Sequence, residues 1–246
     1  MRIVVIFSAL LLGWPVCAET ARIAVASNFA TMAETLAAGF HRTSGHEVII
    51  IPGSTGKLYA QIAAGAPFDA FLSADETTPI RLAEANLAVP DSRFTYAIGT
   101  LVLWSREPAG PSEDMQSALR RARYVAIANP KLAPYGKAAM QSIANIGLLN
   151  DLGDKIVMAE NVGQAFAMVQ SGAADIGFVA ASSLFDANTS DRVVWPVPPA
   201  LHDPILQDAV LLRHGRENLA AIGFLDYLRT WPVREEIRSS GYEATP

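Results

Sequence analysis

The sequence alternates short apolar runs with stretches of helical spacing, and this alternation most limits the folds that the chain can adopt. The run 47–53, EVIIIPG, is rich in β-branched residues and is typical of a strand buried on both faces. It is followed by TGKLYAQIAAG, in which Leu58 and Ile62 lie four residues apart and Gly65 marks the end of a helix. Strands that alternate with helices in this way predict an α/β fold with crossover connections.

Runs of the same two kinds continue in alternating order along the chain. Further strands are expected at 21–29, 68–74, 123–130, 155–160 and 174–183, and further helices at 30–45, 78–87, 134–147, 161–172 and from 218 onward. The segments 64–74 and 171–181 are similar to each other, which suggests two related α/β lobes rather than one long sheet.

Two apolar stretches, 94–105 and 202–215, stand between these blocks and could each run from one lobe to the other. We therefore predict a discontinuous first lobe, residues 19–97 plus 206–246, and a second lobe, residues 98–205. Four prolines between 196 and 204 punctuate the return path.

The N-terminus has the pattern of a secretory signal peptide, which we expect to span residues 1–18. Arg2 precedes an apolar stretch that is too short to cross a membrane, and small residues end at Ala18. A lipid anchor on Cys17 is the alternative, but the residues before this cysteine do not fit the usual lipoprotein pattern. The pattern predicts secretion. Because Cys17 is the only cysteine, the mature chain would have no disulfide and no cysteine metal ligand.

The charge balance of the chain is acidic. Without Arg2 the chain has 18 basic and 24 acidic residues, and the basic residues form no cluster. Nucleic acid is therefore not an expected partner.

The run 53–57, GSTGK, is similar at first sight to a phosphate-binding P-loop. Only two residues separate Gly53 from Gly56, where a P-loop has four, and Leu58 follows Lys57 where a P-loop has serine or threonine. A strand, a tight turn and a helix remain, and such a turn presents free N–H groups to an anion. The simpler interpretation is that the hydroxyl groups only cap the helix.

Four strand-to-helix turns, two in each lobe, carry small polar groups. They are Ser27-Asn28, Ser54-Thr55, Tyr135-Gly136 and Asn161-Val162. Such turns line the crevice at the carboxyl ends of the strands, where α/β proteins bind ligands. If two lobes face each other, the four helix starts converge, and neutral donors alone could hold a dianion.

An enzyme is not predicted. The Gly-x-Ser-x-Gly elbow of serine hydrolases and the common histidine metal motifs are missing. No histidine has an aspartate at motif spacing, so a solvated surface position is expected for His41, His46, His202 and His214. Core or interlobe packing is expected for Trp104, Trp195 and Trp231. Lys57 is expected to point to water.

Several separated blocks resemble the periplasmic molybdate-binding proteins of ABC transporters. These blocks are ASNF, GSTGKLYAQIAAGAPFDAFLSAD, NPKLAPYGKAA and ENVGQAFAMVQSGAADIGFVA, and the resemblance extends from about residue 22 to the C-terminus. It implies a hinged, two-lobed periplasmic binding protein fold of type II that closes on molybdate or tungstate. It also implies an ABC permease as partner, a monomer and no cofactor.

The resemblance implies an oxyanion held by hydroxyl, amide and backbone N–H groups in the cleft. Matching the blocks assigns this role to Ser27, Asn28, Ser54, Thr55, Tyr135 and Val162, the last two mainly through backbone N–H groups. Some members have a tyrosine ligand late in the chain, where this sequence has Ala180, so that contact must come from Asn28 or another group.

Three alternatives stay open. The same fold could bind another oxyanion, such as sulfate, or a small carboxylate. A secreted hydrolase could use Ser54 as its nucleophile. The chain could also be a receptor in which the ligand serves only to trigger closure.

Overall fold

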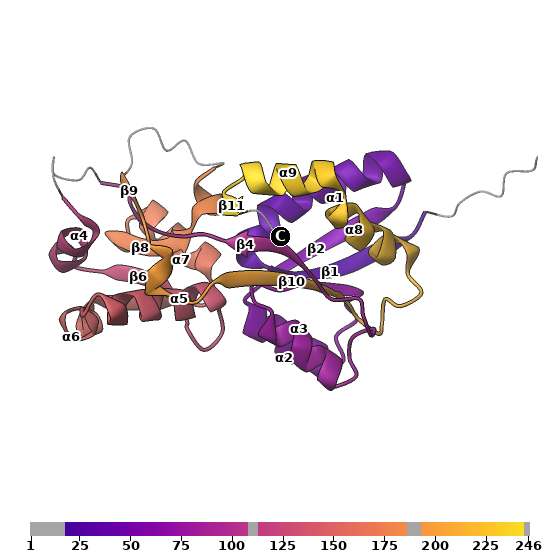
Figure 1. Cartoon of the computed structure of the whole chain (residues 1–246), viewed down its shortest axis with the longest axis horizontal. Coiled ribbons are helices and arrows are strands. Elements are labelled where there is room, and N and C mark those ends of the chain that lie inside the picture. Colours follow the sequence, from indigo (N-terminus) through magenta and orange to yellow (C-terminus); the bar gives the residue numbers. More distant parts are fainter. Residues whose placement is uncertain (1–17, 108–112, 186–192, 244–246) are drawn as a thin grey trace, which may run out of the picture.

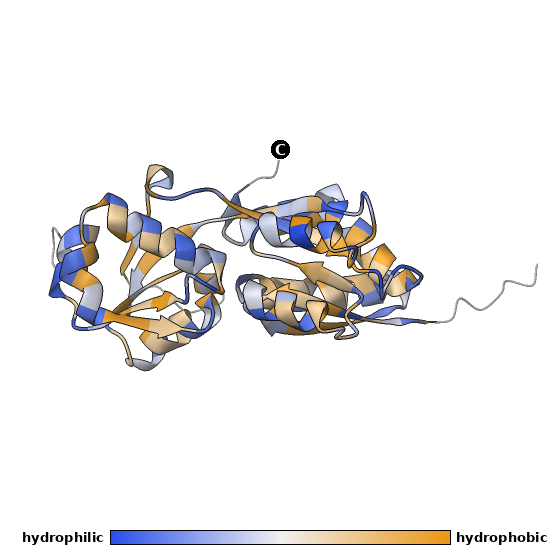
Figure 2. Cartoon of the chain, turned by 90° about the horizontal axis from the view of Figure 1, so that it is seen from below, coloured by the Kyte–Doolittle hydropathy of each residue, from blue (hydrophilic) through white to orange (hydrophobic). Residues whose placement is uncertain are grey.

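The computed structural model describes residues 18–107, 113–185 and 193–243. The chain forms two lobes that lie side by side along the long axis of the molecule (Figure 1). The strands inside both lobes are mainly apolar (Figure 2). The predicted two-lobed α/β fold is therefore confirmed. Except for Ala18, the predicted signal peptide lies outside the described residues, within which no helix is long and apolar enough to span a bilayer.

The first lobe contains a six-stranded mixed sheet with the order β11-β4-β10-β3-β1-β2. Its strands are β1 (Thr20–Ala26), β2 (Glu47–Gly53), β3 (Ala70–Leu72), β4 (Phe94–Gly99), β10 (Ile205–Leu211) and β11 (Tyr242–Glu243). β1 pairs in parallel with β2 and β3, whereas β10 is antiparallel to both of its neighbours. The helices of this lobe are η1 (Ser27–Phe29), α1 (Ala30–Ser44), α2 (Thr55–Ala63), α3 (Thr77–Glu84), α8 (Leu219–Arg229) and α9 (Trp231–Ser239).

The second lobe contains a five-stranded sheet with the order β7-β6-β8-β5-β9. Its strands are β5 (Leu101–Ser105), β6 (Val125–Ala128), β7 (Ile156–Ala159), β8 (Ile176–Ala180) and β9 (Val193–Pro196). Its helices are α4 (Met115–Arg121), α5 (Pro134–Asn145), α6 (Leu149–Leu152) and α7 (Val162–Ser171), with short 3₁₀ turns η2 (Gly153–Lys155), η3 (Ala181–Leu184) and η4 (Pro199–Leu201).

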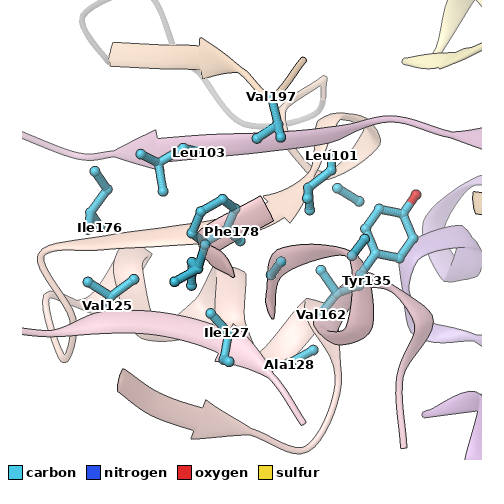
Figure 3. Packing of buried hydrophobic residues seen from close by; sticks show 14 of the residues in the cluster. Leu101, Leu103, Val125, Ile127, Ala128, Tyr135, Val162, Ile176, Phe178 and Val197 are labelled. Atoms are coloured by element: carbon cyan, nitrogen blue, oxygen red, sulfur yellow. The ribbon is translucent and has the colours of Figure 1, made fainter. Parts of the chain in front are cut away.

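The second sheet is buried on both faces, and side-chain alternation along the strands explains how. Leu101 and Leu103 of β5 join one apolar cluster, and Val102 and Trp104 join another on the opposite face. Tyr135 lies at the edge of the first cluster, with its hydroxyl directed toward the other lobe (Figure 3). The core thus fixes the start of α5 at the border between the lobes.

The chain crosses between the two sheets at two places. The first crossing is the single residue Thr100 between β4 and β5, and the second is the segment 197–204 between β9 and β10. Thr100 lies within the first stretch that the sequence indicated, 94–105, whereas the second crossing begins before the indicated stretch 202–215 and overlaps it only at residues 202–204.

Two expectations about packing are wrong. β2 is not buried on both faces, because it is the edge strand and pairs only with β1, so the Ile49 residue is 44% exposed. Trp231 lies on the surface with 73% exposure, because it begins α9 on the side away from the core. Trp104, by contrast, is fully buried, as expected.

Candidate functional site

The four strand-to-helix turns meet around one cavity between the lobes. All six residues implied by the resemblance line it: Ser27, Asn28, Ser54, Thr55, Tyr135 and Val162. Its volume is about 10 Å³, which is roughly the space for one water molecule. In this arrangement the lobes are close together on both sides of the cavity.

Strand register brings the turns together within each lobe. In the first lobe, Ala26 at the end of β1 is paired with Gly53 at the end of β2, so the polar residues that follow are neighbours. In the second lobe, Ala128 of β6 is paired with Ala159 of β7 in the same way. Because these strands are parallel, the helix starts that follow share one edge of each sheet.

The start of α5 approaches β6 so closely that only glycine fits. A Cβ atom on Gly136 would lie 2.2 Å from the carbonyl oxygen of Ala128 and 2.7 Å from its carbonyl carbon. Without a side chain at this position, the preceding residue, Tyr135, can face the cavity with its N–H in the first helical turn.

Two buried polar atoms that line the cavity have no hydrogen-bond partner within the described part of the chain. They are the Ser54 hydroxyl oxygen and Asn28 Oδ1, in residues that are 2% and 7% exposed. An unpaired buried group costs about 1–3 kcal/mol, so such groups are rare and call for an explanation. Ser54 occupies the N-cap position of α2, yet its side chain makes no capping bond. The simpler interpretation, that this hydroxyl only caps the helix, is therefore wrong.

The other turns differ in how their side chains are used. Asn161 does cap α7, because its Oδ1 accepts a hydrogen bond from the Gln164 N–H at 3.0 Å. The Thr55 hydroxyl accepts from the Ala74 N–H at 3.2 Å. Val162, at the first position of α7, is 2% exposed and can offer only its backbone N–H. The site thus combines free side-chain groups with N–H groups of helix starts.

Several contacts cross the cleft and hold the lobes together. The Gly56 N–H donates to the Leu132 carbonyl at 2.9 Å, and the Gly163 N–H donates to the Ser27 hydroxyl at 3.4 Å. Lys57 does not simply point to water, as the sequence had suggested. Its Nζ lies 2.5 Å from Glu160 Oε2 of the second lobe, in a partly exposed ion pair.

A fully buried glutamine forms the base of the site, and sequence reasoning missed it. Gln207 of β10 accepts from Asn28 Nδ2 at 2.8 Å and donates to the Tyr135 hydroxyl at 3.2 Å. The Asn28 carbonyl oxygen accepts from the Tyr242 hydroxyl at 2.7 Å and from the Ser182 hydroxyl at 3.2 Å. Three of these residues come from strands or turns outside the four turns and carry no local motif, so no sequence signal marked them.

The Ser54 hydroxyl has no histidine partner that could act as its general base within the described residues. Among the same residues, no group of three or more potential metal ligands occurs. His214 does have a carboxylate partner, Asp69 at 3.0 Å, which the spacing did not reveal. This aspartate is otherwise bound to the Arg22 N–H at 2.7 Å, so the pair fastens the ends of β1 and β3.

Buried tyrosine hydroxyls surround the base of the site. Burial raises the pKa of Tyr96 and of Tyr135 well above the ordinary value near 10, and burial likewise raises the pKa of Tyr242. All three hydroxyls therefore stay protonated at neutral pH and can act as donors.

We expect the protein to lose stability as the pH rises above about 10. Below that pH the three tyrosines are protonated in both states, so their contribution is complete. Above it the unfolded chain releases protons that the folded chain keeps, and each tyrosine then costs up to about 1.4 kcal/mol per pH unit. Melting temperatures measured by circular dichroism from pH 8 to 11.5 test this. Tyr242→Phe should flatten the decline, and Tyr124→Phe, at a partly exposed residue, should leave it unchanged; an equal effect of both would contradict the explanation.

The chain is similar in sequence and in fold to several known proteins. A family model described as bacterial extracellular solute-binding protein matches residues 21–243. The molybdate-binding protein ModA of Azotobacter vinelandii is 42% identical over 98% of this chain and 96% of its own length. ModA of Rhodobacter capsulatus is 42% identical over 94% and 91%, respectively. The solved periplasmic molybdate-binding protein of A. vinelandii has a TM-score of 0.86 with 39% identity, over 92% of this chain and all of that one.

Proposed function

Because the chain belongs to the bacterial extracellular solute-binding protein family, we propose that it captures molybdate between its lobes and delivers this anion to an ABC permease. The observation that carries the proposal is the pair of buried, unpaired polar atoms, the Ser54 hydroxyl oxygen and Asn28 Oδ1, at the point where four helix starts meet. The relatives named as molybdate-binding proteins support the choice of anion. Tungstate has nearly the same size and charge, so we expect it to bind as well.

Each turn has a distinct part in holding the oxyanion. Hydroxyl groups of the first lobe donate from Ser27 and Ser54, and the Asn28 amide, turned so that Nδ2 faces the cavity, donates beside them. Backbone N–H groups at the helix starts supply the remaining bonds, with the positive end of each helix dipole behind them. They belong to Thr55, Tyr135 and Val162.

No cationic side chain takes part in this scheme. Lys57 is the cation in the turn 53–57, and it is already paired with Glu160. Hydrogen bonds to a charged group contribute about 1.5–3 kcal/mol each. The summed contribution of six such hydrogen bonds exceeds the lower estimates of the free-energy cost of association, about 4 kcal/mol.

Binding requires the lobes to open and close. The cavity lies between the lobes, and the contacts from Gly56 and Ser27 across the cleft must break before an anion can enter from solvent. We propose that the lobes, residues 19–97 plus 206–246 and residues 98–205, rotate about the two crossings near Thr100 and 197–204. The closed form then expels water and presents one surface to the permease.

The cellular setting follows the same proposal. The mature protein starts after Ala18, acts in the periplasm as a monomer, uses no cofactor and catalyses no reaction.

The proposal is tested by calorimetric titration of the mature protein with molybdate, tungstate, sulfate and phosphate. We expect molybdate and tungstate to bind in the micromolar range or more tightly, and both to bind at least a hundredfold more tightly than sulfate. Tightest binding of sulfate would show that the anion is wrong while leaving the fold untouched.

The matched control is Ser54→Ala. In a binding protein this change weakens molybdate binding by about tenfold, roughly 1.4 kcal/mol, through the loss of one donor. A hydrolytic activity that disappears in this variant would instead favour the serine hydrolase.

A further inference from the structure

Gln207 lies beside an irregularity in the pairing of β10 with β4. Gln207 is paired with Ala97 and the next residue, Asp208, with Thr95, so Tyr96 is the extra residue of a β-bulge on β4. Bulges redirect side chains and are often found beside functional sites. Asp208 anchors this one, because its buried carboxylate pairs with Arg93 and accepts from the Thr95 hydroxyl at 2.7 Å. The bulge therefore holds the Gln207 amide firmly at the base of the site.

The hydrogen bonds around Gln207 leave one atom unsatisfied. Gln207 Oε1 accepts from Asn28 Nδ2 at 2.8 Å and from the Tyr96 hydroxyl at 3.1 Å, while Gln207 Nε2 donates to the Tyr135 hydroxyl at 3.2 Å. Asn28 Oδ1 is then buried without a partner. If this oxygen faced an oxyanion, two acceptors would oppose each other.

Turning both amides by half a turn pairs every amide group except Asn28 Nδ2 without displacing the side chains, because an amide keeps its shape when its oxygen and nitrogen exchange places. Gln207 Nε2 would then donate one hydrogen to Asn28 Oδ1 and the other to the Tyr96 hydroxyl. Tyr96 can still donate to the Ser73 carbonyl, which it already contacts at 3.0 Å. The Tyr135 hydroxyl would donate to Gln207 Oε1. Asn28 Nδ2 would take the unpaired position and bring its N–H groups to the anion.

We propose that Gln207 fixes which face of the Asn28 amide meets the ligand, and that it thereby determines selectivity for fully deprotonated oxyanions. With Nδ2 facing the cavity, a protonated oxygen finds no acceptor there, so hydrogen phosphate is rejected. With Oδ1 facing the cavity, the protonated oxygen of hydrogen phosphate would find an acceptor, and hydrogen phosphate would bind. Gln207 is a positioning residue, since it acts through Asn28. The inference rests on the proposed function.

Sulfate and hydrogen phosphate at pH 8 form a matched pair of probes, because both are tetrahedral dianions of similar size and only phosphate carries a proton. Their dissociation constants are measured by displacement of molybdate from the wild type, from Gln207→Met and from Gln207→Glu. We expect the wild type to favour sulfate over phosphate by at least tenfold. In Gln207→Met the preference should fall toward one, because Asn28 is free to turn.

Gln207→Glu keeps the shape of the side chain but can only accept. It should hold Asn28 Nδ2 away from the cavity and lower the sulfate preference by tenfold or more. Its added charge repels both dianions alike, so the ratio of the two constants cancels this effect. If the role of Gln207 were purely structural, both variants would bind sulfate and phosphate more weakly by the same factor. A ratio of the two dissociation constants that is unchanged in both variants would overturn the inference.

A second readout covers the case in which both competitors bind too weakly to measure. Side-chain amide NMR signals of Asn28 should shift on addition of molybdate to the wild type, because its N–H groups bond to the anion, and they should not do so in Gln207→Glu. Equal shifts in both proteins would contradict the proposal. If the wild type fails to bind molybdate at all, the proposed function fails. If it binds and the ratio and the shifts are unaffected, only the role of Gln207 fails.

Discussion

Replacing Asn28 by aspartate is expected to weaken molybdate binding by a thousandfold or more. The side chain lines the cavity and is 7% exposed, so the new carboxylate would face a dianion with little screening by water. Two unit charges 4 Å apart repel by about 4 kcal/mol at an effective dielectric constant of 20, which corresponds to about three factors of ten in affinity. Calorimetric titration at pH 8 measures the loss.

The control for this prediction is Asn28→Ala, which removes the amide without adding charge. We expect about a tenfold loss, roughly 1.4 kcal/mol. Binding to Asn28→Asp should also recover as the pH falls, because a buried carboxyl that becomes protonated is neutral and can donate. Equal losses in the two variants, with no recovery at low pH, would show that Asn28 does not touch the anion.

Gly136→Ala is expected to lower the free energy of unfolding by about 3 kcal/mol or more. The added Cβ would lie 2.2 Å from the Ala128 carbonyl oxygen, a backbone atom that cannot turn away as a flexible side chain can. Overpacking of this kind usually costs about 1–3 kcal/mol, and the upper end applies where backbone meets backbone. Because α5 must shift away from β6, the N–H of Tyr135 leaves the cavity, and molybdate binding falls as well. Denaturant unfolding with and without molybdate measures both effects.

Gly153→Ala is the matched control. A Cβ at Gly153 would meet nothing within 4 Å, and its backbone, with φ of −49°, is one that alanine adopts readily. We expect a neutral effect or a small gain, up to about 1 kcal/mol, from the lower entropy of the unfolded chain. Similar losses in the two variants would mean that close packing of α5 on β6 is not the cause.

Local patterns predicted most of the fold, because period and turn chemistry are local properties. The helical spacing of Leu58 and Ile62 predicted α2, and the proline at position 134 predicted the first turn of α5. Whether a strand lies at the edge or in the centre of its sheet is not a local property, however. The β-branched run 47–53 has the composition of a central strand, and only the sheet order shows that nothing pairs with its outer side. Trp231 is misplaced for a similar reason, since composition alone does not say which face of α9 meets the core.

The residues of the candidate site also fall into two groups, those that local patterns predict and those that depend on long-range contacts. The residues in the four turns could be named from sequence, because each turn follows a strand and opens a helix. Gln207 could not, because its place depends on a register shift between β10 and β4, strands that are more than a hundred residues apart in the chain. The same holds for the pair of Lys57 and Glu160, which exists only because two lobes meet.

The order of strands in the first sheet also limits when that sheet can be completed during synthesis. β10 lies between β3 and β4, so these earlier strands have no common neighbour until residue 211 has emerged. The second sheet uses only residues between 101 and 196 and meets no such delay. When the chain emerges with its N-terminus first, every part of the second sheet is therefore present while the first sheet still lacks its central strand, and the lobe that begins the chain is the last to be finished.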